Sequence, residues 1–172
     1  MRRILGIDPG SRSTGYGIID DQPQGPVMVV QGCIRTQSEN FPERLKQIYD
    51  GVFSIAREYA PNELAIEQVF VHKNADSALK LGQARGASIC GALAAGLPVY
   101  EYAAREVKQA LVGKGSADKT QVQHMVKILL GLSEPLQIDA SDALGVALCH
   151  QHTQETIRRM QRMTRTVTGV SR

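Results

Sequence analysis

The spacing of apolar residues at the start of the chain is that of short β-strands. Apolar side chains cluster, or alternate with polar ones, over residues 3–7, 14–20 and 27–34, and turn-forming residues rich in Pro and Gly separate these segments. Neighbouring strands joined by such short connections favour an antiparallel meander. We therefore expect the chain to begin with a three-stranded antiparallel sheet.

The periodicity changes to that of an amphipathic helix at residue 41. Over residues 41–59 apolar side chains recur every three or four positions, with Asn40 as the expected N-cap and Pro42 in the first turn. The rest of the chain continues this alternation of strands and helices. Two further strands are predicted over residues 64–71 and 98–102, and further helices over residues 75–95, 104–112, 118–130 and 140 to about 160.

The order of these elements predicts an α/β fold. Strand–helix–strand connections make neighbouring strands parallel, so we expect a five-stranded mixed sheet in which the first, fourth and fifth strands are parallel and helices flank both faces. The helix over residues 75–95 is unusually rich in small residues, which would let another helix or a partner subunit approach closely. These are Gly82, Gly86, Ala87, Gly91 and Ala92.

The composition predicts the number of cores and the cellular compartment of the protein. With 172 residues, of which 42% are apolar, the chain can bury one core. It has no uninterrupted apolar run of the roughly 18 to 20 residues that span a bilayer, and Asp8 comes too early for a signal peptide. We expect a cytoplasmic protein. Its three distant cysteines indicate neither a disulfide framework nor a zinc site and are predicted to be small core residues: Cys33, Cys90 and Cys149.

The positive charge is concentrated at the end of the chain. Residues 158–172 contain five arginines and no acid, so the remaining residues carry −2 although the whole chain carries +3. We expect a domain over residues 1–157 followed by a basic tail, a solvated helix end with a disordered terminus. Because the body is slightly acidic, a nucleic-acid partner would need lysines gathered on one face.

Two acids stand at or inside the predicted strands. Asp8 ends the first strand directly before Pro-Gly, where an Asp is often only a turn residue. Glu67 interrupts the apolar run of the fourth strand, and a carboxylate inside a central strand costs several kcal/mol unless it is paired, protonated or bound to a cation. The alternative for Glu67 is an edge strand with the side chain in water.

Two more acids stand at the start of the last helix. Asp139 and Asp142 are three positions apart, so their side chains share one face within roughly 5 to 6 Å. Taken alone, they fit an N-cap and a first-turn acid favoured by the helix dipole. If the first and fourth strands are parallel neighbours, however, Asp8 and Glu67 meet at one end of the sheet, where open α/β sheets place their sites.

Together the four acids predict a site for hard divalent cations. Carboxylates without His or Cys partners favour Mg²⁺, with Mn²⁺ as the alternative, over zinc. Two such ions would activate a water on one side of a phosphodiester and stabilise the leaving oxygen on the other. The histidines do not fit this set and are interpreted as surface or core residues: His72, His124, His150 and His152.

Four segments of the chain, in order, closely resemble RuvC, the family of bacterial Holliday-junction resolvases. They are residues 6–17 (GIDPGSRSTGYG), 65–70 (AIEQVF), 73–86 (KNADSALKLGQARG) and 139–144 (DASDAL). Any one of them is a modest signal, whereas four in register are highly specific. The resemblance runs from residue 4 to about residue 150 and leaves out the basic tail.

The resemblance implies an activity and a site. The family's metal-binding catalytic carboxylates fall on Asp8, Glu67, Asp139 and Asp142 without substitution. The implied fold is RNase H-like. The implied activity is Mg²⁺-dependent resolution of four-way DNA junctions, by paired symmetric nicks in strands of like polarity, in DNA recombination and repair.

The resemblance also implies partners and DNA contacts. A two-fold homodimer suits the approximate two-fold symmetry of a four-way junction, and RuvA and RuvB are the implied branch-migration partners. Phe70 matches the family's aromatic that stacks on a base near the cut, and Lys108 and Lys119 match lysines that approach the scissile phosphates. We add Lys114 as a DNA contact because of its Gly-Lys-Gly-Ser loop. A core Phe and solvated lysines are the ordinary alternatives.

Two rival functions remain open at this point. The first segment also resembles the first phosphate loop of actin- and Hsp70-type ATPases and sugar kinases, but those proteins need two such domains and a second Asp-x-Gly-Gly loop, which is absent. Gly113-Lys114-Gly115-Ser116 lacks Walker A spacing. A catalytically silent junction-binding protein is disfavoured because acids facing phosphate weaken binding.

Overall fold

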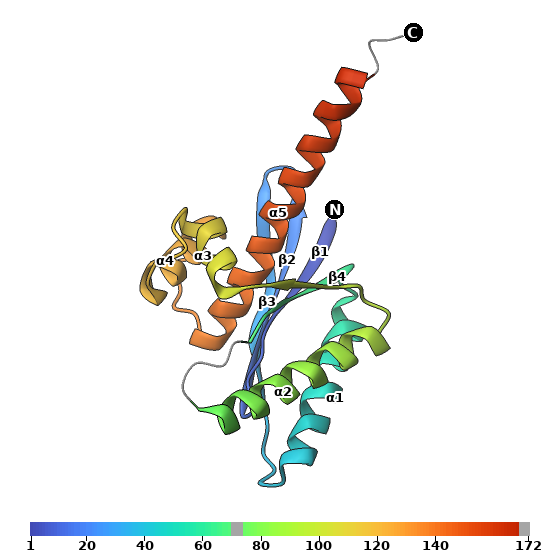
Figure 1. Cartoon of the computed structure of the whole chain (residues 1–172), viewed down its shortest axis with the longest axis vertical. Helices are drawn as coiled ribbons and strands as arrows, with labels where there is room; N and C mark the ends of the chain where they lie inside the picture. The colour runs from blue at the N-terminus through green and yellow to red at the C-terminus, as the bar shows by residue number, and fades with distance from the viewer. Residues whose placement is uncertain (70–73, 169–172) are drawn as a thin grey trace.

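The chain folds around one five-stranded mixed sheet, as predicted (Figure 1). The computed structural model describes residues 1–69 and 74–168, the last four of them without their side chains. The strand order is β3-β2-β1-β4-β5; β1 is antiparallel to β2 and parallel to β4, and β4 is parallel to β5. The strands are β1 (Arg2–Asp8), β2 (Ser13–Gln22), β3 (Gly25–Arg35), β4 (Glu63–Glu67) and β5 (Val99–Tyr102).

Helices cover both faces of this sheet (Figure 1). On one face lie α1 (Phe41–Tyr59) and α2 (Ala75–Ala94). On the other lies α5 (Ile138–Thr168), which is flanked by α3 (Ala104–Val112) and α4 (Lys119–Leu129). Asn40 stands at the N-cap of α1 as expected, although its side chain makes no capping hydrogen bond.

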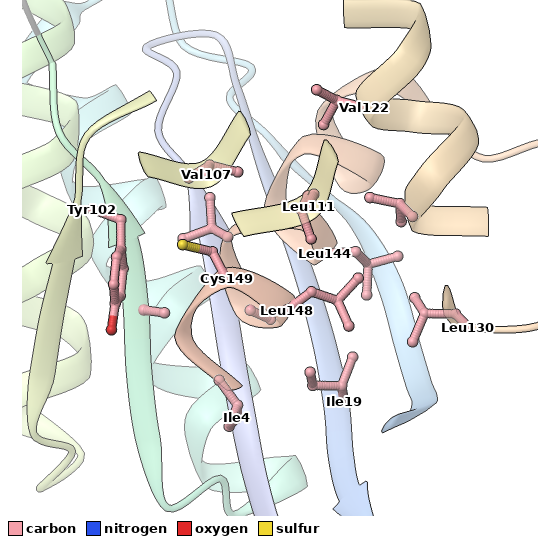
Figure 2. Packing of buried hydrophobic residues seen from close by; sticks show 14 of the residues in the cluster. Ile4, Ile19, Tyr102, Val107, Leu111, Val122, Leu130, Leu144, Leu148 and Cys149 are labelled. Atoms are coloured by element: carbon pink, nitrogen blue, oxygen red, sulfur yellow. The ribbon is translucent and has the colours of Figure 1, made fainter. Parts of the chain in front are cut away.

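The central strand β1 is buried on both sides, so its residues serve two cores. Successive side chains of a strand point to opposite faces. Ile4 packs with Leu144 and Leu148 of α5 (Figure 2), whereas Leu5 packs with Val52 on the α1 side. This alternation explains the continuous apolar run at the start of the chain and fixes which face each later β1 residue addresses.

Two predicted boundaries are wrong. The fourth strand ends at Glu67 and not at residue 71; Gln68 and Val69 are not strand, and residues 70 and 71 lie outside the described part. The last helix begins at Ile138, before the predicted 140, and continues to Thr168. Asp139 therefore lies inside the first helical turn and is not an N-cap.

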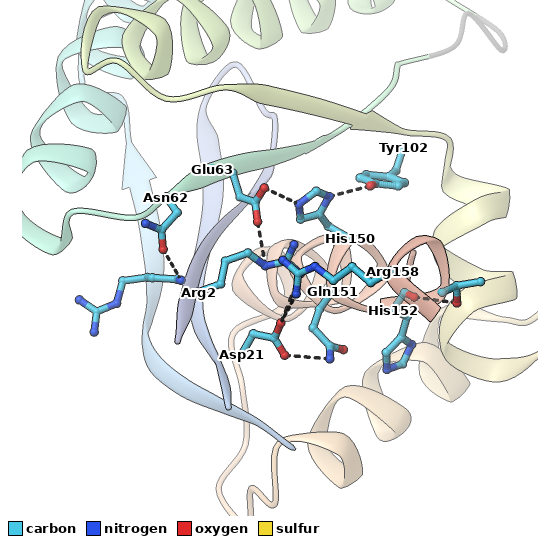
Figure 3. Close-up of polar contacts among 11 residues, drawn as sticks. Arg2, Asp21, Asn62, Glu63, Tyr102, His150, Gln151, His152 and Arg158 are labelled. Atoms are coloured by element: carbon cyan, nitrogen blue, oxygen red, sulfur yellow. Dashed lines mark hydrogen bonds and ion pairs between the residues drawn. The ribbon is translucent and has the colours of Figure 1, made fainter. Parts of the chain in front are cut away.

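A buried polar network around His150 holds α5 against the sheet (Figure 3). His150 of α5 is fully buried; its Nδ1 lies 2.6 Å from the Tyr102 hydroxyl and its Nε2 lies 3.2 Å from a Glu63 carboxylate oxygen. Arg2 pairs with the other oxygen of Glu63 at 2.9 Å. Burial lowers the pKa of His150, although Glu63 opposes this shift. A neutral ring can accept the Tyr102 hydroxyl at Nδ1 and carry its own hydrogen on Nε2, the nitrogen nearer to Glu63.

The other predicted core residues vary in exposure. Cys149 is buried and Cys33 partly so, but Cys90 is exposed, so the core assignment is wrong for that residue. His124 is exposed and His152 partly buried, while His72 lies outside the described residues. None of the helices in the described parts of the chain is long and apolar enough to cross a bilayer.

Candidate active site

The parallel pairing of β1 and β4 brings Asp8 and Glu67 together. Ile7 is in register with Ile66, so Asp8 and Glu67 follow side by side at the carboxyl ends of adjacent strands, about 4.8 Å apart in the backbone. Ile7 and Ile66 belong to the core on the α1 side. By the alternation of strand residues, Asp8 and Glu67 therefore face α5. Because β4 lies between β1 and β5, the edge-strand alternative for Glu67 is wrong.

Glycines let the start of α5 lie directly on the sheet, next to these two acids. A Cβ placed on Gly15 of β2 would lie only 2.0 Å from the carbonyl oxygen of Asp139, and one on Gly6 of β1 would lie 2.1 Å from that of Ala143. Only a residue without a side chain permits such main-chain approach. The first turns of α5 are thereby held against β1 and β2.

Each acid of α5 already has a polar partner. The Ser13 hydroxyl donates to Asp139 Oδ2 at 2.6 Å, and Lys119 Nζ lies 2.6 Å from Asp142 Oδ2. Within residues 1–69 and 74–168, no three His, Cys, Asp or Glu side chains stand as a ready-made metal-binding group. One oxygen of Asp139 is therefore bonded to Ser13 and one oxygen of Asp142 is paired with Lys119, while the Asp8 and Glu67 side chains are partly buried.

The charges of the four acids interact strongly. Burial, followed by the charges of Glu67, Asp142 and Asp139, raises the pKa of Asp8 to about 7. Burial also raises the pKa of Glu67, to which the charge of Asp142 adds, and the pKa of Asp142 in spite of Lys119. Burial by itself would lower the pKa of Lys119. Its hydrogen bond to Asp142 and the charges of the nearby acids outweigh this effect, so that the pKa of Lys119 is raised overall. The site thus holds more negative charge than its residues neutralise, which suits a cation.

Two hollows of about 190 Å³ each open beside the acids. One lies between the acids and α3 and α4 and is lined by Glu67, Asp142, Lys108 and Lys119, together with apolar residues. The other is lined by Asp8 and Glu67 on the side of α2. The structure thus brings two of the predicted DNA contacts, Lys108 and Lys119, to the acids.

The remaining two predicted contacts are Lys114 and Phe70. Lys114 is exposed between α3 and α4 and lines neither hollow. Phe70 lies outside the described residues. Their roles in DNA binding stay predictions.

A family model described as "Crossover junction endodeoxyribonuclease RuvC" matches residues 4–150. The chain belongs to the RuvC family. It is 66% identical over 165 residues to the crossover junction endodeoxyribonuclease RuvC of Methylococcus capsulatus, an alignment that covers 96% of this chain and 99% of the relative. Membership rules out the ATPase and sugar-kinase alternative.

Solved structures agree with this family assignment. The Thermus thermophilus RuvC in complex with Holliday junction substrate matches with a TM-score of 0.84 and 33% identity, covering 91% of this chain and 96% of that one. The yeast mitochondrial Holliday junction resolvase Ydc2 matches with a TM-score of 0.70 and 10% identity, covering 96% of this chain and 86% of that one, and so supports the fold alone. The expected RNase H-like fold is confirmed.

Several site-forming residues of this RuvC-family chain were missed by sequence reasoning. Ser13 bonds Asp139, Gly15 lets α5 approach, and Arg85 of α2 donates to the main-chain oxygen of Glu67 at 3.0 Å while pairing with Glu101 of β5. All three lie in or beside the recognised segments. Their spacing signals no such contact, because each depends on which strands become neighbours.

The metal-free protein is expected to lose stability as the pH rises from about 4 to about 7. Across this interval folded Asp8, with a pKa of about 7, keeps a proton that the unfolded chain, with a pKa near 3.8, has released. Raising the pH therefore favours unfolding. Asp8→Asn should flatten the slope and stabilise the apo protein at pH 7, an effect on the order of a few kcal/mol. Part of the slope should survive, since Glu67 and Asp142 shift in the same direction.

Denaturant unfolding in EDTA at pH 5, 6, 7 and 8 measures this effect. Asp50→Asn on α1 is the matched control, because it makes the same chemical change at a half-exposed residue paired only with Lys46 among the described side chains. It should keep the parent slope. Parallel profiles for the parent and Asp8→Asn would show that Asp8 is not held with a raised pKa.

Proposed function

We propose that this chain is a magnesium-dependent endonuclease that resolves Holliday junctions by paired symmetric nicks, in DNA recombination and repair. The observation that carries the proposal is the gathering of Asp8, Glu67, Asp139 and Asp142 at one end of a RuvC-family sheet. The RuvC structure with bound Holliday junction, similar over most of both chains, supports the choice of substrate.

The four acids are the proposed metal ligands, and the donor set fits that role. All donors are carboxylates, which favours Mg²⁺ or Mn²⁺. The raised pKa values of Asp8, Glu67 and Asp142 mark a partly buried site with unneutralised negative charge. Two bound ions would supply an activated water and charge stabilisation for the leaving oxygen.

The protein's own side chains orient the substrate and the acids. Ser13 fixes the rotamer of Asp139, and Arg85 holds the end of β4 from which Glu67 projects. Lys108 and Lys119 line the hollow beside Glu67 and Asp142, where ammonium groups can bind the backbone phosphates of the cut strand. Phe70 is the proposed base-stacking residue, and Lys114 is a proposed outer phosphate contact.

The proposed assembly is a homodimer built on α2. Its outer side presents the exposed residues Leu79 and Leu93, and a Cβ on Gly82 or Gly86 would meet no described atom within 4 Å. A second helix can approach such a surface closely, and a closed two-fold dimer would offer two sites to a junction of matching symmetry. RuvA and RuvB are the proposed partners, in the cytoplasm, on the strength of family resemblance.

The arginine-rich end is proposed to be separate from the catalytic domain of residues 1–157. The match to the family model covers residues 4–150, whereas α5 continues to Thr168. The division therefore concerns function and not a break in the helix.

A cleavage assay on the unmodified protein tests the proposal. We expect paired nicks at symmetric positions in a synthetic four-way junction with Mg²⁺ or Mn²⁺, no cutting in EDTA, and no cutting of a linear duplex with the same arm sequences. Binding of the junction without cutting in any divalent metal would favour the silent junction-binding alternative. Equal cutting of the linear duplex would contradict selectivity for junctions.

A further inference from the structure

A third hollow borders Asp139 and is lined by neither Lys108 nor Lys119. It encloses about 330 Å³ and is lined by Cys33, Arg35, Gln137, Ile138 and Asp139. The only cation of this lining is Arg35, the last residue of β3. The hollow shares Asp139 with the proposed metal site, so a DNA strand that extended across the acids toward β3 would reach it.

The strand register places the Arg35 side chain on the face of the sheet that α5 covers. Arg35 stands directly opposite Ser13 across the β2–β3 pair, and directly opposed residues place their side chains on the same face, with Cβ atoms about 5 Å apart. Ser13 is on the α5 face, since its hydroxyl bonds Asp139. Cys33, two positions before Arg35, is bonded to Gln137 on that same face. Arg35 therefore projects beside the first turn of α5.

Arg35 is exposed, and among the described residues its guanidinium has no ion pair or side-chain hydrogen bond, although it lines the same hollow as Asp139. Neighbouring Arg12, by comparison, lies 3.9 Å from Glu39. A charged group that is exposed, unpaired and aimed into a hollow can bind an anion without first breaking an internal contact. Guanidinium binds phosphate through two parallel hydrogen bonds.

We propose that Arg35 binds a backbone phosphate of the strand being cut, next to the scissile phosphate and on the side opposite to Lys108 and Lys119. The inference rests on the proposed nuclease function. A DNA strand carries a charge about every 3.4 Å along its axis. A strand whose scissile phosphate lies at the acids thus has phosphates on both sides of them. Lys108 and Lys119 bind the phosphates on one side of the acids, and Arg35 binds the phosphate on the other.

Junction binding in EDTA by Arg35→Gln tests the inference. We expect about a 10-fold loss of affinity, the size of one charge-assisted hydrogen bond. The slope of log affinity against log salt concentration should become shallower by about 1, as for one lost phosphate contact. Arg35→Lys should restore the slope, because it keeps the charge, but only part of the affinity. Arg57→Gln, an exposed arginine on α1, makes the same change away from the site and should match the parent in both.

Junctions with single neutral methylphosphonate linkages locate the contact. One substitution next to the cut should weaken the parent and Arg35→Lys but leave Arg35→Gln unaffected. Parent affinity and salt slope in Arg35→Gln would overturn the inference. So would a slower cleavage rate at saturating DNA with unchanged affinity, since Arg35 would then act on Asp139 instead of on phosphate. If the proposed function is right, the parent protein cuts the junction whatever the result for Arg35→Gln. Failure of the parent to cut would therefore contradict the proposed function and not the Arg35 contact.

Discussion

Asp142→Asn protein is expected to bind a synthetic four-way junction at least as tightly as the parent and to cut it at least about 100-fold more slowly with Mg²⁺. The amide keeps the size of the side chain but removes a negative ligand from a cation site. Since groups that merely support a metal ligand contribute about 10- to 100-fold, loss of the ligand itself should cost no less. Binding survives because the substitution removes a negative charge that would repel phosphate.

Gel-shift binding in EDTA and single-turnover cleavage with Mg²⁺ measure the two halves of this expectation. Asp50→Asn is again the control and should bind and cut like the parent. Parent-rate symmetric nicking by Asp142→Asn would remove Asp142 from the site. Loss of both folding and binding would instead make Asp142 a structural residue, since Lys119 would be left without its partner.

Gly15→Ala is expected to reduce cleavage by about 100-fold and to destabilise the fold. The new Cβ would lie 2.0 Å from the Asp139 carbonyl oxygen and 3.0 Å from its Cβ, so the start of α5 has to move off β2. Overpacking of this kind costs about 1 to 3 kcal/mol. A displacement of about 1 Å at a catalytic group can cost about 100-fold in rate.

Gly145→Ala provides the comparison within the same helix. Its Cβ would meet Leu111 at 3.4 Å, which is ordinary contact, and alanine favours a helix over glycine. This variant should cut at the parent rate, with equal or greater stability. Thermal unfolding and single-turnover cleavage at a temperature where all variants are folded separate the two effects. Parent-like cleavage by folded Gly15→Ala would show that the acids tolerate movement of α5.

The positions of the strands and of most helices were predictable because their burial follows a simple period. Leu5, Ile7 and Ile18 face one core, and Ile4 and Ile19 face the other, so the first strands are apolar throughout. The same apolar pattern hides the end of β4 at Glu67. Apolar residues continue past Glu67, and only the pairing with β5, which ends at Tyr102, determines where the ladder stops.

The site was only partly predictable, because its residues come from elements that meet through the fold. Each acid taken alone suits a turn, a strand edge, a cap or a helix dipole; the parallel pairing of β1 with β4 makes neighbours of Asp8 and Glu67. The hydrogen bond between Ser13 and Asp139 joins residues 126 positions apart in the chain, and no local sequence pattern predicts it. The same holds for Lys119 and Asp142, because the lysine belongs to α4 and looks like an ordinary first-turn residue.

The bonds of His150 constrain how α5 can turn about its own axis. His150 is eleven positions after Asp139, about three helical turns, so the two side chains leave the helix in nearly the same direction, about 16 Å apart. Glu63 and Tyr102, on two adjacent strands, contact the Nε2 and Nδ1 atoms of the His150 ring, respectively. A twist of α5 that moved Asp139 and Asp142 away from the sheet would have to break these buried bonds. The orientation of the acids is therefore set partly by the contacts of α5 with Glu63 and Tyr102, about three helical turns away from Asp139.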